Sequence, residues 1–236
     1  MHSLRYLRYD VKQIIRDPTT VLLMFTPLIL ILSIKPLLLL AQRYIYPFFH
    51  INLLEYNIYI SSVIFQLIPG MLGTVIGFMM LDDKDGRIYE LMSITPLGRE
   101  GYFYNRIIFP SLILILYSFI TYFVLNISCL SIIQLIVITI LLIIQAIIIS
   151  LILFDIADDK VKGLTYAKLI NAGMIFALSD LFNSKVLSSL SFLFPQYWFT
   201  KIIRDFNIYN ITIVMSLHIL WLVILFNRFL NNKNQA

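Results

Sequence analysis

Long apolar runs, separated by short polar segments, dominate the pattern of the chain. The longest run covers residues 107–154, which are 48 positions without a charged side chain. One transmembrane helix needs about 20 apolar residues, so this run predicts two spans joined by a tight turn at the polar residues 126–131. Lipid offers no partners to backbone N–H and C=O groups, and the runs lack the alternation of barrel strands, so the spans are expected to be helices.

The same pattern predicts six spans in all. They are placed at residues 20–42, 58–81, 107–126, 130–154, 165–185 and 209–228. The first contains Lys35, the fifth contains Asp180 and the last contains His218. Residues 1–236 are therefore expected to form one all-α integral membrane domain.

Composition and charge agree with this class and suggest an orientation. Hydrophobic residues make up 60% of the chain and charged residues only 13%, whereas an average soluble domain carries about a quarter charged residues. The predicted spans place thirteen of the 18 Lys and Arg residues on one side. Because cytoplasmic loops are rich in Lys and Arg, both termini and residues 82–106 are expected in the cytoplasm. The net charge of +5 follows from this asymmetry and requires no nucleic-acid partner.

The N-terminal residues combine an apolar face with a basic stripe at helical spacing. The apolar face carries Leu4, Leu7, Val11 and Ile14 or Ile15, and the basic stripe carries Arg5, Arg8, Lys12 and Arg16. A helix in the membrane interface favours this arrangement. Asp17-Pro18 should then end the helix, because proline disfavours helical geometry in the residue before it. Residues 3–17 are interpreted either as a topology anchor or as an elbow helix that braces the bundle near a cytoplasmic partner.

A charged island follows the second predicted span. Residues 82–106 hold nine of the 31 charged residues. Asp85-Gly86 is expected to start a short helix, and Thr95-Pro96 is expected to end it. Its apolar surface would carry Ile88, Leu91, Met92 and Ile94. Such a helix suits insertion into a groove on another protein, although a solvated loop with a polar helix is an equal alternative.

A second candidate region lies around the end of the fifth predicted span. Residues 184–205 are expected to form an outer hairpin that re-enters the membrane, with Pro195 at its turn. Asp180 is predicted to pair with Lys185 or Lys35 near an exit gate. A charged residue inside a membrane is costly, so it is expected to have a function. Lys35 is also close enough to the outer boundary to extend its side chain to the interface.

Three motifs resemble the membrane subunits of type 2 ABC exporters. The pattern between the second and third spans is similar to that family's "E-x-x-x-G-T-x-x-x-L-x-x-T-P-L", and Arg16-Asp17-Pro18 is similar to its "R-D-P". Phe194-Pro-Gln-Tyr-Trp198 looks like the "f-P-x-y-W" of a drug- and peptide-export branch. The chain departs from the pattern at Arg87, where many relatives have Thr. The first pattern is carried here by Asp83 or Asp85, Gly86, Glu90, Leu91, Thr95, Pro96 and Leu97.

The resemblance implies a permease subunit in a bacterial cell membrane that exports a hydrophobic or amphipathic drug, peptide or lipid-like molecule. It implies two copies of an ATPase subunit, which would bind ATP and Mg²⁺, and a second permease chain, identical or related. This chain would bind no cofactor itself. Residues 82–98 would contain the coupling helix that receives the motion of the ATPase, through Asp85, Gly86, Arg87, Ile88, Glu90, Leu91, Thr95 and Pro96. The elbow helix would use Arg5, Arg8, Lys12, Arg16, Asp17 and Pro18, and a gate or pathway would involve Asp180, Lys185, Pro195, Tyr197 and Trp198.

Other function classes find less support in the sequence. The chain has no G-x-x-x-x-G-K-[ST] phosphate loop, so ATP hydrolysis is expected from another subunit. The glycines of residues 70–77 lie in a span and are interpreted as close helix packing. The three histidines are widely separated and form no H-E-x-x-H motif, which disfavours an intramembrane enzyme or a metal site. A membrane immunity or scaffold protein that binds a toxin or peptide without transport stays open as the alternative.

Overall fold

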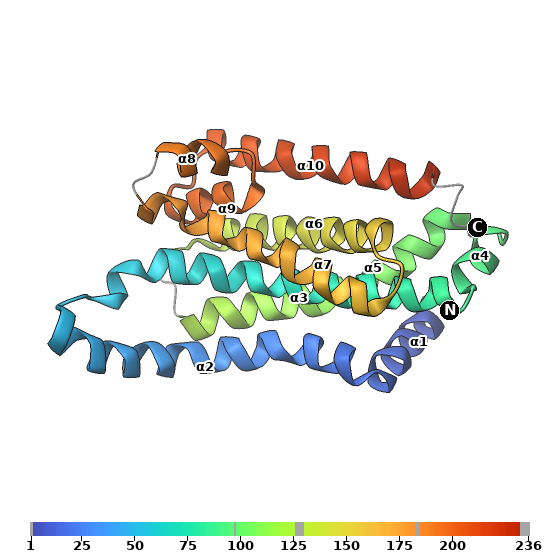
Figure 1. The fold of residues 1–236 in the computed structure, drawn as a ribbon, viewed down its shortest axis with the longest axis horizontal. Helices are drawn as coiled ribbons and strands as arrows, with labels where there is room; N and C mark the ends of the chain where they lie inside the picture. The colour runs from blue at the N-terminus through green and yellow to red at the C-terminus, as the bar shows by residue number, and fades with distance from the viewer. Residues whose placement is uncertain (1, 97, 126–129, 183–184, 232–236) are drawn as a thin grey trace.

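The computed structural model describes residues 2–96, 98–125, 130–182 and 185–231, which form an elongated helical bundle (Figure 1). No strand occurs among these residues, so the predicted all-α class is confirmed. In chain order the elements are α1 (His2–Arg16), α2 (Pro18–Phe49), η1 (Leu53–Tyr56), α3 (Asn57–Asp85), α4 (Ile88–Ser93), α5 (Gly98–Leu125), α6 (Ile132–Ile156), α7 (Lys160–Ala172), η2 (Gly173–Phe182), α8 (Lys185–Ser191), α9 (Pro195–Arg204) and α10 (Ile208–Asn231), where η marks 3₁₀ geometry.

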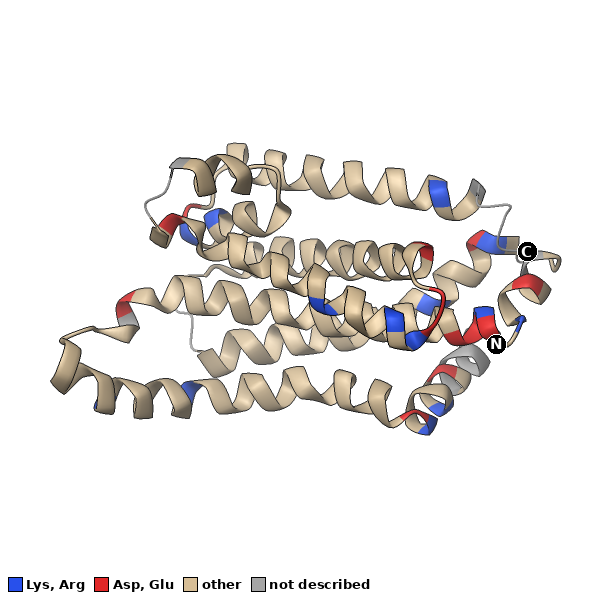
Figure 2. Ribbon diagram, in the orientation of Figure 1, with Lys and Arg blue, Asp and Glu red and all other residues tan. Residues whose placement is uncertain are grey.

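The long helices run between two ends of the molecule that differ in content. One end, which we call the α4 end, holds α1 and α4; the other, the α9 end, holds α8 and α9 (Figure 1). Charged residues gather at both ends and are sparse between them (Figure 2). This distribution is the one expected of a bundle whose middle lies in a hydrocarbon layer.

Five helices are long and apolar enough to cross a membrane. They are α2, α3, α5, α6 and residues Ile208–Leu230 of α10, at the positions of the first four predicted spans and the last. α5 differs most from its predicted span of 107–126. It begins at Gly98 and so includes charged residues that were expected before the span. The predicted turn at 126–131 falls largely on residues outside the described ranges. Only its end is seen, where Ser131 caps α6 and exchanges hydrogen bonds with Gln134.

The predicted fifth span coincides with α7 and η2. α7 has 13 residues and η2 has ten, and neither is by itself among the helices long enough to cross a membrane. The backbone changes from α to 3₁₀ geometry at Gly173. A 3₁₀ run of this length is unusual, since its hydrogen-bond geometry is poorer than that of an α-helix. The count of six spans therefore stays a prediction.

α3 lies at the centre of the bundle and packs against α2, α5, α6, α7 and α9. Its closest approach to α6 depends on two glycines. A β-carbon built on Gly73 would lie 2.7 Å from the Ala146 carbonyl oxygen, and one on Gly77 would lie 3.0 Å from Leu153 Cβ. The interpretation of these glycines as helix-packing residues is confirmed, because a β-carbon at either position would lie too close to atoms of α6.

The predicted boundaries of α1 and α4, the two short helices at the α4 end, are partly right. α1 ends at Arg16 and α2 begins at Pro18, as expected; the Asp17 carboxylate caps α2 by accepting from the Thr19 N–H at 3.0 Å. The start of α4 was predicted wrongly. Asp85 is the last residue of α3 and caps nothing, and the left-handed residue in the turn is Arg87 (φ 56°) rather than Gly86.

At the α9 end, two short helices occupy the predicted outer hairpin. α9 begins at Pro195, directly after the turn that separates it from α8. Tyr197 and Trp198 are buried, and the Trp198 indole donates to the Phe192 carbonyl at 2.9 Å. α9 is thus held firmly against the bundle. Whether this pair of helices re-enters a bilayer stays a prediction.

Candidate functional site

A buried ion cluster joins three helices at the α4 end. Arg106 of α5 pairs with Asp10 of α1 and with Asp83 of α3, and all three side chains are at most 6% exposed. The Arg106 Nε donates to Asp83 Oδ2 at 2.6 Å, and the Tyr102 hydroxyl donates to the same oxygen at 2.7 Å. One guanidinium therefore locks the N-terminal helix to the central helix of the bundle.

The two carboxylates of this cluster accept different numbers of hydrogen bonds. Asp83 accepts from two nitrogens of Arg106 and from Tyr102, whereas Asp10 accepts from a single nitrogen of Arg106. The second oxygen of Asp10, like that of Asp83, is buried without a hydrogen-bond partner among the described residues. Burial raises the pKa of Asp10 to about 6, although Arg106 acts in the opposite direction. Asp10 is thus poised to take up a proton just below neutral pH.

A second ion group lies on the neighbouring side of α1. Lys160, at the start of α7, pairs with Asp17 at 2.5 Å and with Asp82 at 2.7 Å. The Gln13 side chain of α1 donates to the Met79 carbonyl of α3 at 3.3 Å. Partial burial acts to raise the pKa of Asp17, but hydrogen bonds from Lys160, Thr20 and Thr19 together bring it down to about 2. α7 is therefore tied to the junction of α1 and α2.

α4 presents one apolar face to the bundle and another to its surroundings. Tyr89 is 2% exposed, and its ring lies 5.2 Å from that of Phe154 of α6, 5.3 Å from that of Tyr102 and 5.8 Å from that of Phe229 of α10. Leu91 and Ile94, by contrast, are 61% and 81% exposed. The helix is anchored to three long helices through one aromatic residue while it offers two large apolar side chains outward.

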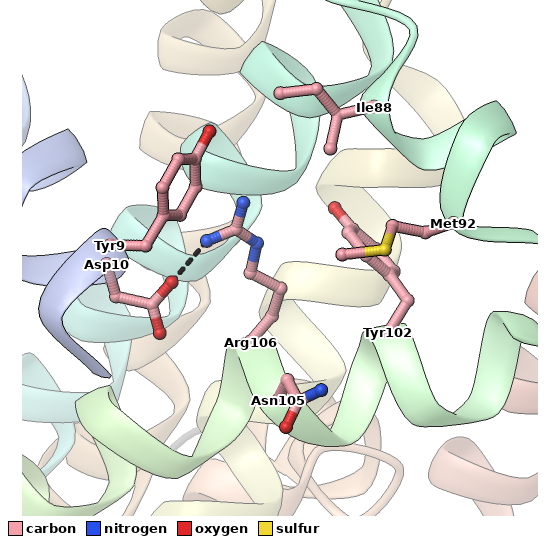
Figure 3. Close-up of a pocket in the computed structure, with 7 residues that line it drawn as sticks. All are labelled: Tyr9, Asp10, Ile88, Met92, Tyr102, Asn105 and Arg106. Atoms are coloured by element: carbon pink, nitrogen blue, oxygen red, sulfur yellow. Dashed lines mark hydrogen bonds and ion pairs between the residues drawn. The ribbon is translucent and has the colours of Figure 1, made fainter. Parts of the chain in front are cut away.

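A cavity of about 340 Å³ separates α4 from α1. Figure 3 shows Ile88 at the top, Tyr9 and Asp10 on one side, Met92 and Tyr102 on the other, and Arg106 with Asn105 below. The ion cluster therefore forms part of the wall of this cavity.

The structure brings only some of the predicted site residues together. Ile88 lies at the cavity, while Thr95 follows α4 and its hydroxyl donates to the Met92 carbonyl at 2.7 Å. Gly86, Arg87 and Pro96 are exposed in the turns on either side of α4. Glu90 is an α4 residue that has an interaction partner, and Asp85 closes α3. Of the predicted basic stripe, Lys12 and Arg16 are exposed on α1; the side chains of Arg5 and Arg8 lie outside the described ones.

Asp180 has partners that were not predicted from the sequence. Its carboxylate pairs with Lys201 at 2.7 Å and with Arg204 at 3.2 Å, both on α9, and it does not pair with Lys35. Lys35 instead lines a small cavity with Asn57 of α3. Lys185 begins α8, and its side chain lies outside the described ones. Because α9 curls back over η2, two cations that are more than 20 residues away in sequence reach Asp180. The pairing of Asp180 with Lys185 stays a prediction.

Four members of the site were not predicted from the sequence: Asp10, Tyr102, Arg106 and Lys160. One signal was present for Asp10. It lies three residues after Leu7 and four before Ile14, so it belongs to the apolar face of the predicted helix, where an acid needs a partner. The identity of that partner could not be read from spacing, because Arg106 is 96 residues further along the chain.

The raised pKa of Asp10 leads to a pH prediction. The folded-state pKa of about 6 lies above the ordinary value of 3.8, so Asp10 contributes stability that is full below about pH 4 and is lost as the pH rises through 6. Wild-type protein should therefore gain thermal stability relative to Asp10→Asn when the pH falls from 7.5 to 5. The measurement is the unfolding midpoint of both proteins in detergent across this range. Asp158→Asn, at an exposed carboxylate, is the control; parallel curves for wild type and Asp10→Asn would contradict the prediction.

Five long apolar helices, charged ends and a short exposed apolar helix tied to the bundle define a multi-pass membrane protein. A family model described as "Rv2686c-like: Fluoroquinolones export permease protein Rv2686c-like" matches residues 10–227. Since the match covers nearly the whole chain, the protein belongs to this family of export permeases. The resemblance to ABC exporter permeases is thereby confirmed. No curated protein matches the chain.

Proposed function

We propose that the chain is the membrane-spanning subunit of an ATP-driven exporter. Two ATPase subunits would bind ATP and Mg²⁺, and a second permease chain, identical or related, would complete the path. α7 with η2 would serve as the fifth of six spans, and the α4 end with both termini would face the cytoplasm. The cargo would be a hydrophobic or amphipathic drug, and the family description favours a fluoroquinolone.

The outer face of α4 is the observation that carries this proposal. Leu91 and Ile94 are large, apolar and exposed at the end that also holds most of the Lys and Arg residues. Full burial of one such side chain contributes about 1.5–3 kcal/mol, so burial of both would supply part of the free energy that holds a partner protein. The same helix is fixed inward through Tyr89, which supports a role as the coupling helix.

The route for the mechanical signal would run through the ion cluster. Closure of the ATPase subunits would push α4 against the cavity wall formed by Tyr102 and Arg106, and Arg106 would pass the displacement to α3 and to the elbow helix α1. Lys160 would extend the same coupling to α7. The central position of α3 supports this proposal, because a shift of α3 reaches most of the bundle.

The test is export by cells that express the chain with its ATPase. Leu91→Asp together with Ile94→Asp should abolish copurification of the ATPase and lower fluoroquinolone export at least tenfold, because two charges would replace the docking surface. Phe48→Asp is the matched control, since Phe48 is 80% exposed on α2, away from α4. An α4 double variant that exports like wild type would refute the coupling role. A chain that binds a toxin or peptide but never an ATPase would favour the immunity or scaffold alternative.

A further inference from the structure

A second, larger cavity lies between α6, α7, η2, α9 and α10, apart from the α4 end. Its volume is about 470 Å³, which falls within the range of sites that hold drug-sized molecules. Its lining contains no Asp, Glu, Lys or Arg. Most of the wall is aliphatic or aromatic, with contributions from Ile149, Ile152, Phe176, Phe194 and Trp221.

Three polar side chains interrupt this apolar wall, and one of them, Gln196 of α9, has a side-chain oxygen that is buried without a hydrogen-bond partner among the described residues. Gln145 of α6 is 5% exposed, and its amide forms no hydrogen bond with any other described residue. His218 of α10 is fully buried. Its Nδ1 lies 2.8 Å from the Val214 carbonyl oxygen and must donate to it, so Nε2 of the neutral ring keeps an acceptor lone pair. Nε2 has no partner among the described residues.

An unpaired buried amide and an unpaired imidazole nitrogen are costly in a membrane bundle. Gln145 lies 13 residues after the start of α6, or about 20 Å along it, and His218 lies ten residues after the start of α10, or about 15 Å along it. Both positions fall near the middle of their helices. Water is scarce at such a depth, so a bound molecule is the natural source of a partner.

The rim of the cavity is exposed and apolar. Leu169, Ile175 and Trp221 are 67%, 54% and 42% exposed. In a bilayer, these residues face acyl chains, so the cavity opens sideways into the membrane rather than along the bundle axis. A ligand would reach it by partition into the bilayer.

We infer that this cavity binds a neutral, apolar, aromatic molecule that carries at least one hydrogen-bond donor. The aromatic wall favours ring stacking and edge contacts. The lack of charged lining residues disfavours an ion, and the Gln145 oxygen and His218 Nε2 select a molecule with an N–H or O–H group. A lipid acyl chain would fill the volume but would leave both acceptors unpaired. The identification of the bound molecule as cargo rests on the proposed function, whereas the binding itself does not.

Binding to the full-length chain in lipid nanodiscs, without any ATPase, tests the inference separately from export. The probe is 6-bromo-2-naphthol, whose bromine quenches tryptophan fluorescence, and the matched probe is its methyl ether, which lacks the donor. The quenching should saturate and should be lost in Trp221→Phe. The naphthol should bind about tenfold more tightly than the ether, the ratio expected for one hydrogen bond.

Three variants make the test specific. Gln145→Leu and His218→Phe keep the apolar shape, and the variant that removes the acceptor used by the naphthol should bring the binding ratio of the two probes close to one. Ala172→Phe adds a ring at an exposed lining position and should weaken both probes. Quenching that never saturates would mean partition into lipid alone and would overturn the inference. An unchanged ratio in both polar variants, with helicity like that of wild type, would overturn it as well.

Discussion

Arg106→Met is expected to cost about 3–5 kcal/mol of folding stability and to leave little folded protein in the membrane. The substitution removes the cation that Asp10 and Asp83 share, and both carboxylates are then buried without compensation. Tyr102 would still donate to Asp83, but one neutral donor cannot balance a buried negative charge. The measurement is the fraction of folded protein as SDS is titrated into detergent micelles, followed by circular dichroism.

A triple variant separates lost packing from uncompensated charge. Arg106→Met combined with Asp10→Asn and Asp83→Asn contains no charge at the site, and replacing a buried ion group by neutral residues is often nearly neutral in free energy. It should therefore recover most of the stability that Arg106→Met loses. Arg43→Met removes an exposed arginine from the part of α2 near the α9 end and should change the folding stability little. Equal stability of the single and triple variants would mean that the arginine acts only through its volume.

Gly73→Leu is the substitution with the second largest expected effect. Its first carbon would already lie 2.7 Å from the Ala146 carbonyl oxygen and 3.1 Å from the Ala146 Cα. These are backbone atoms, so no rotamer change relieves the contact and α3 must move away from α6. Since overpacking of a tight core commonly costs about 1–3 kcal/mol and a leucine adds three more carbons, a loss of at least 3 kcal/mol is expected.

Gly173→Ala is the matched control for this position. A β-carbon at Gly173 would meet a single side-chain nitrogen at 3.9 Å, and the backbone has a helical φ of −58°. That substitution should leave stability unchanged or raise it by up to about 1 kcal/mol, because alanine restricts the unfolded chain. Thermal unfolding of both variants in the same detergent is the measurement. A Gly73 variant as stable as wild type would show that α3 and α6 do not approach closely in the membrane.

The two candidate regions differ in how much their residues could be predicted. The α4 segment was found because its signals are local: a charged island between apolar runs, an apolar face at helical spacing and Thr95-Pro96 at its end. The ion cluster was not found, because it joins residues from helices that are far apart in sequence. For the same reason, Asp180 was predicted to pair with Lys185 or Lys35, and its partners Lys201 and Arg204 were not found. Spacing along the chain indicates only partners that are near in sequence. It does not indicate that α9 folds back over η2.

The sequence by itself determined the class of this protein, the positions of five long helices and the break at Asp17-Pro18. These depend on properties that each residue carries with it: the cost of a polar group in lipid, the fixed geometry of proline and the length that a helix needs to cross a bilayer. Only the tertiary structure decided which charges share Arg106, that Leu91 faces outward while Tyr89 is buried, and that Gln145 and His218 border one cavity. Those facts depend on how helices distant in sequence pack against α3, and no single segment encodes that packing.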